Sequence, residues 1–163
     1  MKIDKSVFIA EGAKVVGKVE IGENSNVWFN AVIRGDSNSI IIGKNTNIQD
    51  NAVIHTSVDA SVKIGDNVTI GHGAIVHGCT IGNNVLIGMG SIILDGAVVE
   101  DNCIIGAGSL VPQNKHVSQN SLGFGNPFVV RREVTEKEKE HILWNANEYV
   151  EEANKYKKGL LRN

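Results

Sequence analysis

The stretch TIGNNVLIGMGSIILDGAVVEDNCIIGAGSLV, residues 80–111, has Ile or Val at every sixth position from Ile81 to Val111. The same rhythm extends back to Ile9 with three irregular intervals. These intervals are Ile33 to Ile42, Ile54 to Ile64 and Val76 to Ile81. A period of six matches neither the 3.6 residues of a helical turn nor a long alternating strand. Each unit is therefore predicted to be a very short strand that ends in a corner.

Hexads of this kind stack as a parallel β-helix, and three of them make one coil. The Ile and Val anchors then fall into three columns, each predicted to form one face of a triangular prism. Face one has Ile9, Val27, Ile48, Ile70, Ile87 and Ile105; face two has Val15, Ile33, Ile54, Val76, Ile93 and Val111; face three has Ile21, Ile42, Ile64, Ile81 and Val99. Anchors one coil apart on the same face should lie about 4.8 Å apart.

A second inward position, four residues after each anchor, is usually small. One bulky β-branched and one small side chain per hexad would fill a narrow prism. The repeat is predicted to stop after Val111, so residues 1–134 form a β-helix domain with an exit segment. Thr135 and Glu138 have the spacing of a capping box, which predicts a final helix within residues 135–163. Its apolar stripe should pack on the prism or on a neighbouring chain; the stripe comprises Ile142, Leu143, Ala146, Tyr149, Val150, Ala153 and Tyr156.

Composition excludes several classes of partner. The chain has 163 residues and a formal net charge of -2, which gives no reason to expect nucleic acid or an anionic membrane. Its opening residues contain no apolar run long enough for a signal peptide, and no later segment could span a bilayer. We expect a soluble, cytoplasmic protein.

Chemistry is predicted on face two. The residue after each anchor points outward, and on two consecutive coils of face two that residue is His55 or His77. The two imidazoles should leave the same face one rung apart, where they can share a metal ion. His72 lies near the corner between faces one and two, and the five residues that separate it from His77 span up to roughly 16 Å when extended. One chain could therefore hardly bring all three rings to the same metal ion. A neighbouring chain is therefore predicted to supply His72.

The predicted assembly is a cyclic trimer, because a flat-sided prism suits a heterologous contact that closes after three copies. Three histidines with an open fourth position form the catalytic type of zinc site, where bound water is acidified. His116 and His141 fit no column and are assigned no role.

Other polar residues fall beside the histidines. Arg34 is one rung below His55, and Asp36 follows it, while Gln49 and Asp50 lie one coil before His72. Two interpretations remain open for this group. It forms a hydrogen-bond and ion-pair network at a trimer interface, or it acts in the site by contacting the metal-bound water or orienting a histidine.

The sequence resembles the γ-class carbonic anhydrase-like branch of the hexapeptide-repeat superfamily. The matching stretches are RGD at residues 34–36, NIQDNAVIH at residues 47–55 and IGHGAIVHGC at residues 70–79. Together with the repeat and the final helix, the resemblance covers nearly the whole chain. It implies a left-handed β-helix, a homotrimer and the reversible hydration of CO2 to bicarbonate.

The resemblance also implies residue roles. It places Zn²⁺, or Fe²⁺ or Co²⁺, between chains on His55, His77 and a neighbour's His72. Arg34 and Asp36 match an interfacial pair and Gln49 matches the residue beside the metal-bound water. Tyr149 of the final helix is a further candidate for lining the site.

Two alternatives to a carbonic anhydrase are carried forward. The same scaffold serves acyl- or acetyltransferases and thioesterases that act on coenzyme A esters, which need one histidine base and no metal. A non-catalytic trimer clamped by its metal is the other alternative. It is motivated by Ser37 and Asp59, which stand where the archetypal enzymes have glutamates.

Overall fold

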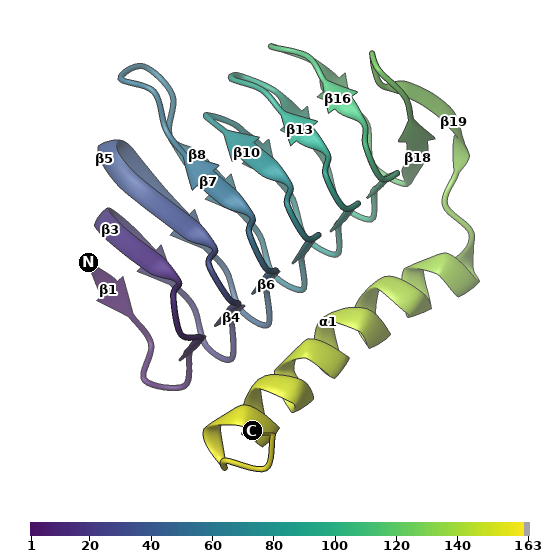
Figure 1. Ribbon diagram of the computed structural model, residues 1–163. Coiled ribbons are helices and arrows are strands. Elements are labelled where there is room, and N and C mark those ends of the chain that lie inside the picture. Colours follow the sequence, from purple (N-terminus) through teal and green to yellow (C-terminus); the bar gives the residue numbers. More distant parts are fainter. Residues whose placement is uncertain (162–163) are drawn as a thin grey trace.

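The computed structural model describes residues 1–161 and is a left-handed parallel β-helix followed by one helix, which confirms the predicted fold class (Figure 1). Face one consists of β2 (Phe8–Ile9), β4 (Asn26–Val27), β6 (Asn47–Ile48), β9 (Thr69–Ile70), β12 (Leu86–Ile87), β15 (Ile104–Ile105) and β18 (Ser121–Phe124). Face two consists of the first parts of β3 (Lys14–Ile21) and β5 (Val32–Ile42), then β7 (Val53–His55), β10 (Ile75–His77), β13 (Ile92–Ile93) and β16 (Leu110–Val111). Face three consists of β1 (Lys2–Ile3), the remaining parts of β3 and β5, then β8 (Val62–Ile64), β11 (Thr80–Ile81), β14 (Val98–Val99) and β17 (His116–Val117).

The strand register reproduces the predicted columns. Ile54 pairs with Val76 on face two, and on face three Ile64 pairs with Ile81. The anchors of the central coils are buried, as are most of the residues four positions after them, with Val58, four residues after Ile54, an exception at 78% exposed. Ile9, in the first coil, is 41% exposed because no further coil covers it. Stacking of successive coils therefore provides the core.

The prediction that the repeat stops after Val111 is wrong. Val117 is buried and pairs with Val99, and Gly123 pairs with Ile105 where another anchor would stand. A Cβ on Gly123 would lie 2.5 Å from the ring of Phe128, which is buried in the same core cluster. The phenylalanine thus fills the space of the missing anchor, and β19 (Val129–Glu133) closes this end by pairing antiparallel to β18.

Asparagines form the corners between faces three and one. Five of them have φ between 51° and 58°, and their side chains bond to one another from coil to coil at 3.0 to 3.3 Å. They are Asn24, Asn45, Asn67, Asn84 and Asn102. Asparagine tolerates the left-handed backbone region better than most residues, so the chain can turn here at every coil.

The helix α1 (Glu136–Lys157) begins with the predicted capping box of Thr135 and Glu138. It runs back along face one, beside β2, β4, β6 and β9, so that its C-terminal end lies near the first coils (Figure 1). Ile142, Ala146 and Ala153 are buried against the prism, whereas Leu143 is 46% exposed and does not belong to the packed stripe. The helix packs on its own prism.

Within residues 1–161, no helix is long and apolar enough to cross a membrane. The cytoplasmic location stays a prediction.

Truncation of a central anchor should destabilise the whole prism. Ile87 is fully buried between Ile70 and Ile105, so we expect Ile87→Ala to lower the free energy of unfolding by about 2–5 kcal/mol in chemical denaturation. Ile9→Ala is the matched control on the same face and should cost much less, because Ile9 is already partly exposed. Equal losses for the two variants would contradict the stacking argument.

Helix docking should depend on pH through Glu138. Hydrogen bonds from Arg132 and from the N–H of Thr135 lower the pKa of Glu138 from 4.5 to about 2. A depressed pKa means that the carboxylate stabilises the folded protein above about pH 4.5, and that this stabilisation is lost as pH falls towards 2. We therefore expect Glu138→Gln to lower the melting temperature at pH 7, with a smaller difference from the wild type at pH 3.

The control for this prediction is Glu136→Gln, because Glu136 is 85% exposed and, among the residues that the structure describes, pairs only with Lys139. It should change the melting temperature little at either pH. A wild-type advantage over Glu138→Gln that is constant from pH 7 to pH 3 would rule out the linkage.

Candidate metal centre

All three irregular intervals of the repeat fall at the same corner, between faces two and three. In the first, β5 continues through the corner as one strand, and in the second a loop separates β7 from β8. In the third, the short link from His77 to Thr80 joins β10 directly to β11. The corner is therefore irregular on three consecutive coils, and His55 and His77 lie at the end of face two that borders it.

His55 and His77 lie directly opposite each other in the paired strands β7 and β10. Their ring centroids are 5.1 Å apart, and Nδ1 of His55 lies 3.1 Å from Nε2 of His77. This pairing follows from the register, because outward side chains at equivalent positions of adjacent parallel strands stand side by side.

A carboxylate contacts the other ring nitrogen of each of these histidines. Asp36 lies 3.0 Å from Nε2 of His55, and Asp95 contacts Nδ1 of His77. Arg34, directly opposite His55 in β5, bonds the same Asp36 at 2.5 Å. The hydrogen bonds from Arg34 and then from His55 lower the pKa of Asp36 to about 2. The pKa of Asp95 is also lowered, chiefly by its hydrogen bond from His77.

These contacts make the histidine pair suited to a cation. A carboxylate only accepts hydrogen bonds, so each neutral imidazole places its proton on the nitrogen that faces its aspartate. The two remaining nitrogens, Nδ1 of His55 and Nε2 of His77, then point lone pairs at each other across 3.1 Å. Two nitrogens bound tetrahedrally to one Zn²⁺ would be about 3.4 Å apart, given Zn–N bonds of about 2.1 Å. The donor set fits a metal after only a small adjustment.

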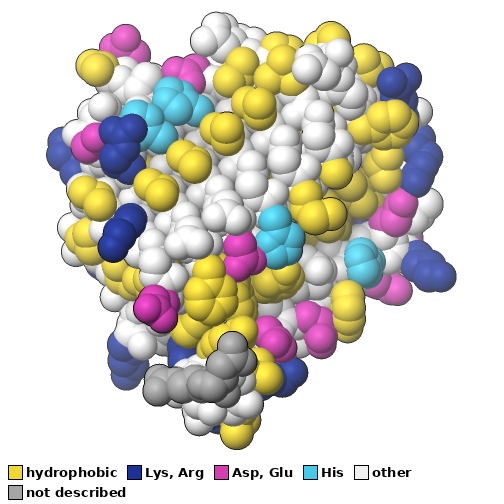
Figure 2. Space-filling model, viewed as in Figure 1, with side chains coloured by type: hydrophobic (Ala, Val, Ile, Leu, Met, Phe, Trp, Pro, Cys, Tyr) yellow, Lys and Arg dark blue, Asp and Glu magenta, His cyan; other side chains and the backbone are white. Residues whose placement is uncertain are grey.

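His72 lies apart from this pair, at the corner between faces one and two. Its Nδ1 bonds Asp50 at 2.8 Å, which leaves Nε2 free and 3.5 Å from the hydroxyl of Tyr149. Figure 2 shows histidine side chains at well-separated places on this side of the molecule. Among residues 1–161, no three His, Cys, Asp or Glu side chains of one chain are grouped to hold a metal.

Gln49 belongs to a buried polar network beneath His72. Its Oε1 accepts the backbone N–H of His72 at 3.1 Å, and its Nε2 donates to Asn47 at 3.0 Å. Asn47 donates to the hydroxyl of Thr69 at 2.9 Å, and Asn145 of α1 donates to the same hydroxyl at 2.8 Å. The network connects the helix with the backbone that carries His72.

Tyr149 lines a groove of about 460 Å³ between α1 and face one, together with Trp28 and Asp50. Burial, with the nearby charge of Asp50 as a second cause, raises the pKa of the Tyr149 phenol. The phenol thus stays protonated near neutral pH and can donate a hydrogen bond towards His72.

Comparisons with known proteins identify the family of the chain. The family of bacterial transferase hexapeptides (six repeats) matches residues 1–35 and 78–113, and the hexapeptide repeat of succinyl-transferase matches residues 39–77. A protein of Methanocaldococcus jannaschii named "Probable carbonic anhydrase" is 55% identical over 148 residues, which are 91% of this chain and 93% of that protein. The chain belongs to the γ-class carbonic anhydrase-like family of hexapeptide-repeat proteins.

Two further comparisons show the breadth of this family. "Gamma carbonic anhydrase 2, mitochondrial" of Arabidopsis thaliana is 43% identical over 154 residues, 91% of this chain but 55% of the plant protein. The chain thus spans little more than half the length of that relative. A crystal structure of a hexapeptide transferase family protein from Anaplasma phagocytophilum has a TM-score of 0.92 and 42% identity, covering 95% of this chain and 92% of that one.

Sequence reasoning missed Asp95 and Asn47. Asp95 follows the anchor Ile93 by two residues, whereas Asp36 follows Ile33 by three, so the position of Asp36 in its repeat gave no signal for Asp95. Asn47 precedes the anchor Ile48 and points outward from face one, where α1 covers it. Only the position of the helix reveals that this asparagine is buried and must be hydrogen-bonded.

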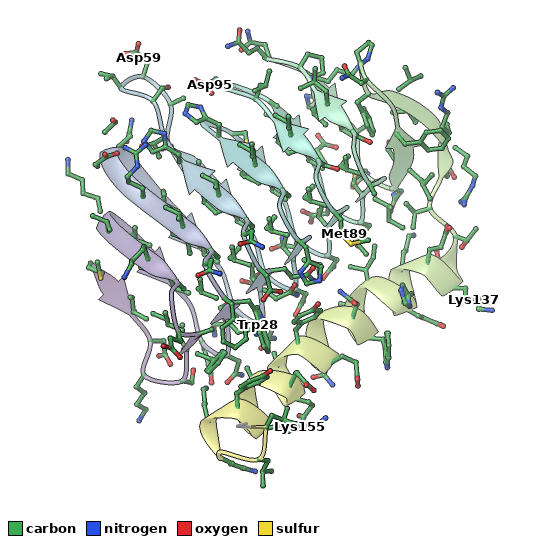
Figure 3. The ribbon with its side chains drawn as sticks, viewed as in Figure 1. Trp28, Asp59, Met89, Asp95, Lys137 and Lys155 are labelled. Carbon is green, nitrogen blue, oxygen red and sulfur yellow. The ribbon has the colours of Figure 1, made fainter. Side chains whose placement is uncertain are left out.

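The γ-class resemblance expects glutamates where this chain has Ser37 and Asp59. Both residues are exposed, and the backbone N–H of Ser37 donates to Asp36 at 2.9 Å. Figure 3 shows Asp59 at the tip of the loop that follows β7, pointing away from the prism.

Loss of Gln49 should loosen the segment that carries His72. We expect Gln49→Ala to lower the free energy of unfolding by about 1–3 kcal/mol, because the amides of Asn47 and His72 lose a partner. The backbone amide of His72 should also exchange with solvent faster, as measured by hydrogen exchange. Gln113→Ala, at an exposed position, is the control and should change neither quantity. Unchanged exchange at His72 would contradict the network's role.

Proposed function

We propose that this protein is a γ-class carbonic anhydrase-like enzyme that hydrates CO2 reversibly to bicarbonate, as a homotrimer with Zn²⁺ between its chains. Fe²⁺ or Co²⁺ would suit the same nitrogen ligands. The observation that carries the proposal is the pair of facing nitrogens of His55 and His77, 3.1 Å apart, each with an aspartate on the opposite side of its ring. The kinship with proteins named carbonic anhydrases supports it.

A row of apolar side chains on the outside of face two supports the trimer. The row lies one residue before five of the anchors of face two, and these side chains are partly exposed in the single chain. They are Val32, Val53, Ile75, Ile92 and Leu110. Figure 2 shows hydrophobic side chains in rows across this side of the molecule. A second chain placed against them would bury apolar area and could bring its His72 to the histidine pair.

Each site residue has a role in the proposed reaction. The cation would supply an acidified water as the nucleophile towards CO2. His55 and His77 would hold it from one chain and His72 from the next, with Asp36 and Asp50 orienting their own histidines.

Three further residues would act around these ligands. Gln49 fixes the backbone at His72, and Tyr149 offers a hydroxyl beside its Nε2. Arg34 keeps Asp36 ionised, because its guanidinium bonds the carboxylate directly.

An acyl-CoA transferase or thioesterase is the second candidate, since the similar Anaplasma structure is named for the hexapeptide transferase family. Such an enzyme needs one histidine as base and would keep its turnover without metal. A metal-clamped trimer without catalysis is the third candidate. It is motivated by the exposed Ser37 and Asp59, which stand in place of glutamates.

The first experiment measures metal per chain and CO2 hydration on the same anaerobically purified protein. We expect about one metal ion per chain, hydration that disappears on chelation, and loss of both in His55→Ala. His116→Ala is the control, because His116 is exposed on face three and pairs with Glu100. Full metal content and hydration in His55→Ala would exclude the proposed site. Metal without hydration would favour the clamp, and acyl-CoA turnover in metal-free protein would favour the transferase.

A mixed-chain experiment tests whether the site is shared. Trimers of His55→Ala alone or of His72→Ala alone should bind no metal at the site. In randomly mixed trimers of the two variants, a site is intact only where His55 comes from one variant and His72 from the other, which is about one quarter of sites. Recovery of about a quarter of the wild-type metal content would support the shared site, and no recovery would contradict it.

A further inference from the structure

Asp95 lies beside His77, where its carboxylate can determine which ring nitrogen of His77 carries the proton. It lies two residues after the end of β13, on the coil after His77, and its carboxylate contacts Nδ1 of that ring. Figure 3 shows Asp95 where the chain leaves face two. The side chains of Asp95 and His77 are 29% and 30% exposed, so the contact is partly shielded from water.

The backbone holds Asp95 in this position. The carbonyl of Asp95 accepts the N–H of Asn114 at 3.0 Å, and the next residue, Gly96, donates its N–H to the carbonyl of Gly78 at 2.8 Å. These bonds tie the residue to both neighbouring coils.

Gly78, which directly follows His77, leaves the room that Asp95 needs. Its φ of 53° lies in the left-handed region, and a Cβ there would lie 2.9 Å from the carboxylate carbon of Asp95. A larger residue at position 78 would displace the carboxylate from the ring.

The contact selects the tautomer of His77. Because the carboxylate accepts the Nδ1 proton, Nε2 keeps its lone pair, and Nε2 is the nitrogen that faces His55. Without Asp95, the proton could reside on Nε2, where it would block a metal ion. Asp36 serves His55 and Asp50 serves His72 in the same manner, so Asp95 completes a set of one aspartate for each histidine.

We propose that Asp95 is a positioning residue that fixes the tautomer and ring orientation of His77 for metal binding. The inference rests on the proposed function and adds a residue to that site. Carboxylates in such positions typically contribute 10–100-fold to metal affinity.

The test uses Asp95→Asn and Asp95→Ala in the full-length protein, with Glu100→Gln as the matched control. Glu100 also bonds a histidine, His116, but on face three. Heteronuclear NMR of the metal-free protein at pH 8 should show His77 with its proton on Nδ1, and this population should shift in both Asp95 variants. The dissociation constant for Zn²⁺, from competition with a chelator, should rise about 10–100-fold, and the visible spectrum of bound Co²⁺ should change. Glu100→Gln should leave all three readouts unchanged.

His77→Ala separates failure of this inference from failure of the proposed function. If His77→Ala loses the metal while both Asp95 variants keep wild-type affinity and tautomer, the role of Asp95 is refuted and the metal site stands. If His77→Ala keeps the metal, the proposed site itself is refuted. If Asp95→Ala does not fold, the isosteric Asp95→Asn decides the outcome.

Discussion

Stacking of one coil on the next is the constraint on which the rest of this structure depends. Each coil buries one β-branched anchor and one small side chain per face, and these are covered only by the coils above and below. The interior is too narrow to accept any other pattern, so the six-residue period must be kept wherever the prism is straight. Departures from the period are confined to the corners, where the chain can loop outward without opening the core.

The candidate metal centre uses this freedom at one corner. Three consecutive coils depart from six residues between faces two and three; Asp36 from the first of them contacts His55, and Asp95 from the coil that follows the third contacts His77. The ladder of paired strands holds the two histidines in register, while the corner between faces two and three supplies Asp36 from an irregular coil and Asp95 from a regular one. The strands thus position the two histidines, and the residues at the adjoining corner supply the carboxylates that contact their rings.

Most of the fold was predictable because a six-residue period has few physical solutions. The columns, the register of His55 with His77 and the capping box at Thr135 all follow from spacing along the chain. The end of the repeat was mispredicted because Val117, which continues the six-residue period after Val111, was not counted as an anchor. At the next anchor position the chain has Gly123, and Phe128, which stands outside the six-residue series, fills its core volume. When a residue outside the six-residue series fills the space of a missing anchor, the sequence shows no periodic signal for it.

By itself, the sequence determined the prism, the face that carries the histidines and the separation of His72 from the other two. Periodicity specifies which residues share a face, because side-chain direction alternates along each strand. Only the tertiary structure decided which nitrogen of each imidazole is free, since that depends on contacts with Asp36, Asp50 and Asp95 from loops or neighbouring coils. It also decided that α1 covers face one and buries Asn47 beneath it. These contacts join side chains that are far apart in the sequence, so the spacing of residues along the chain does not predict them.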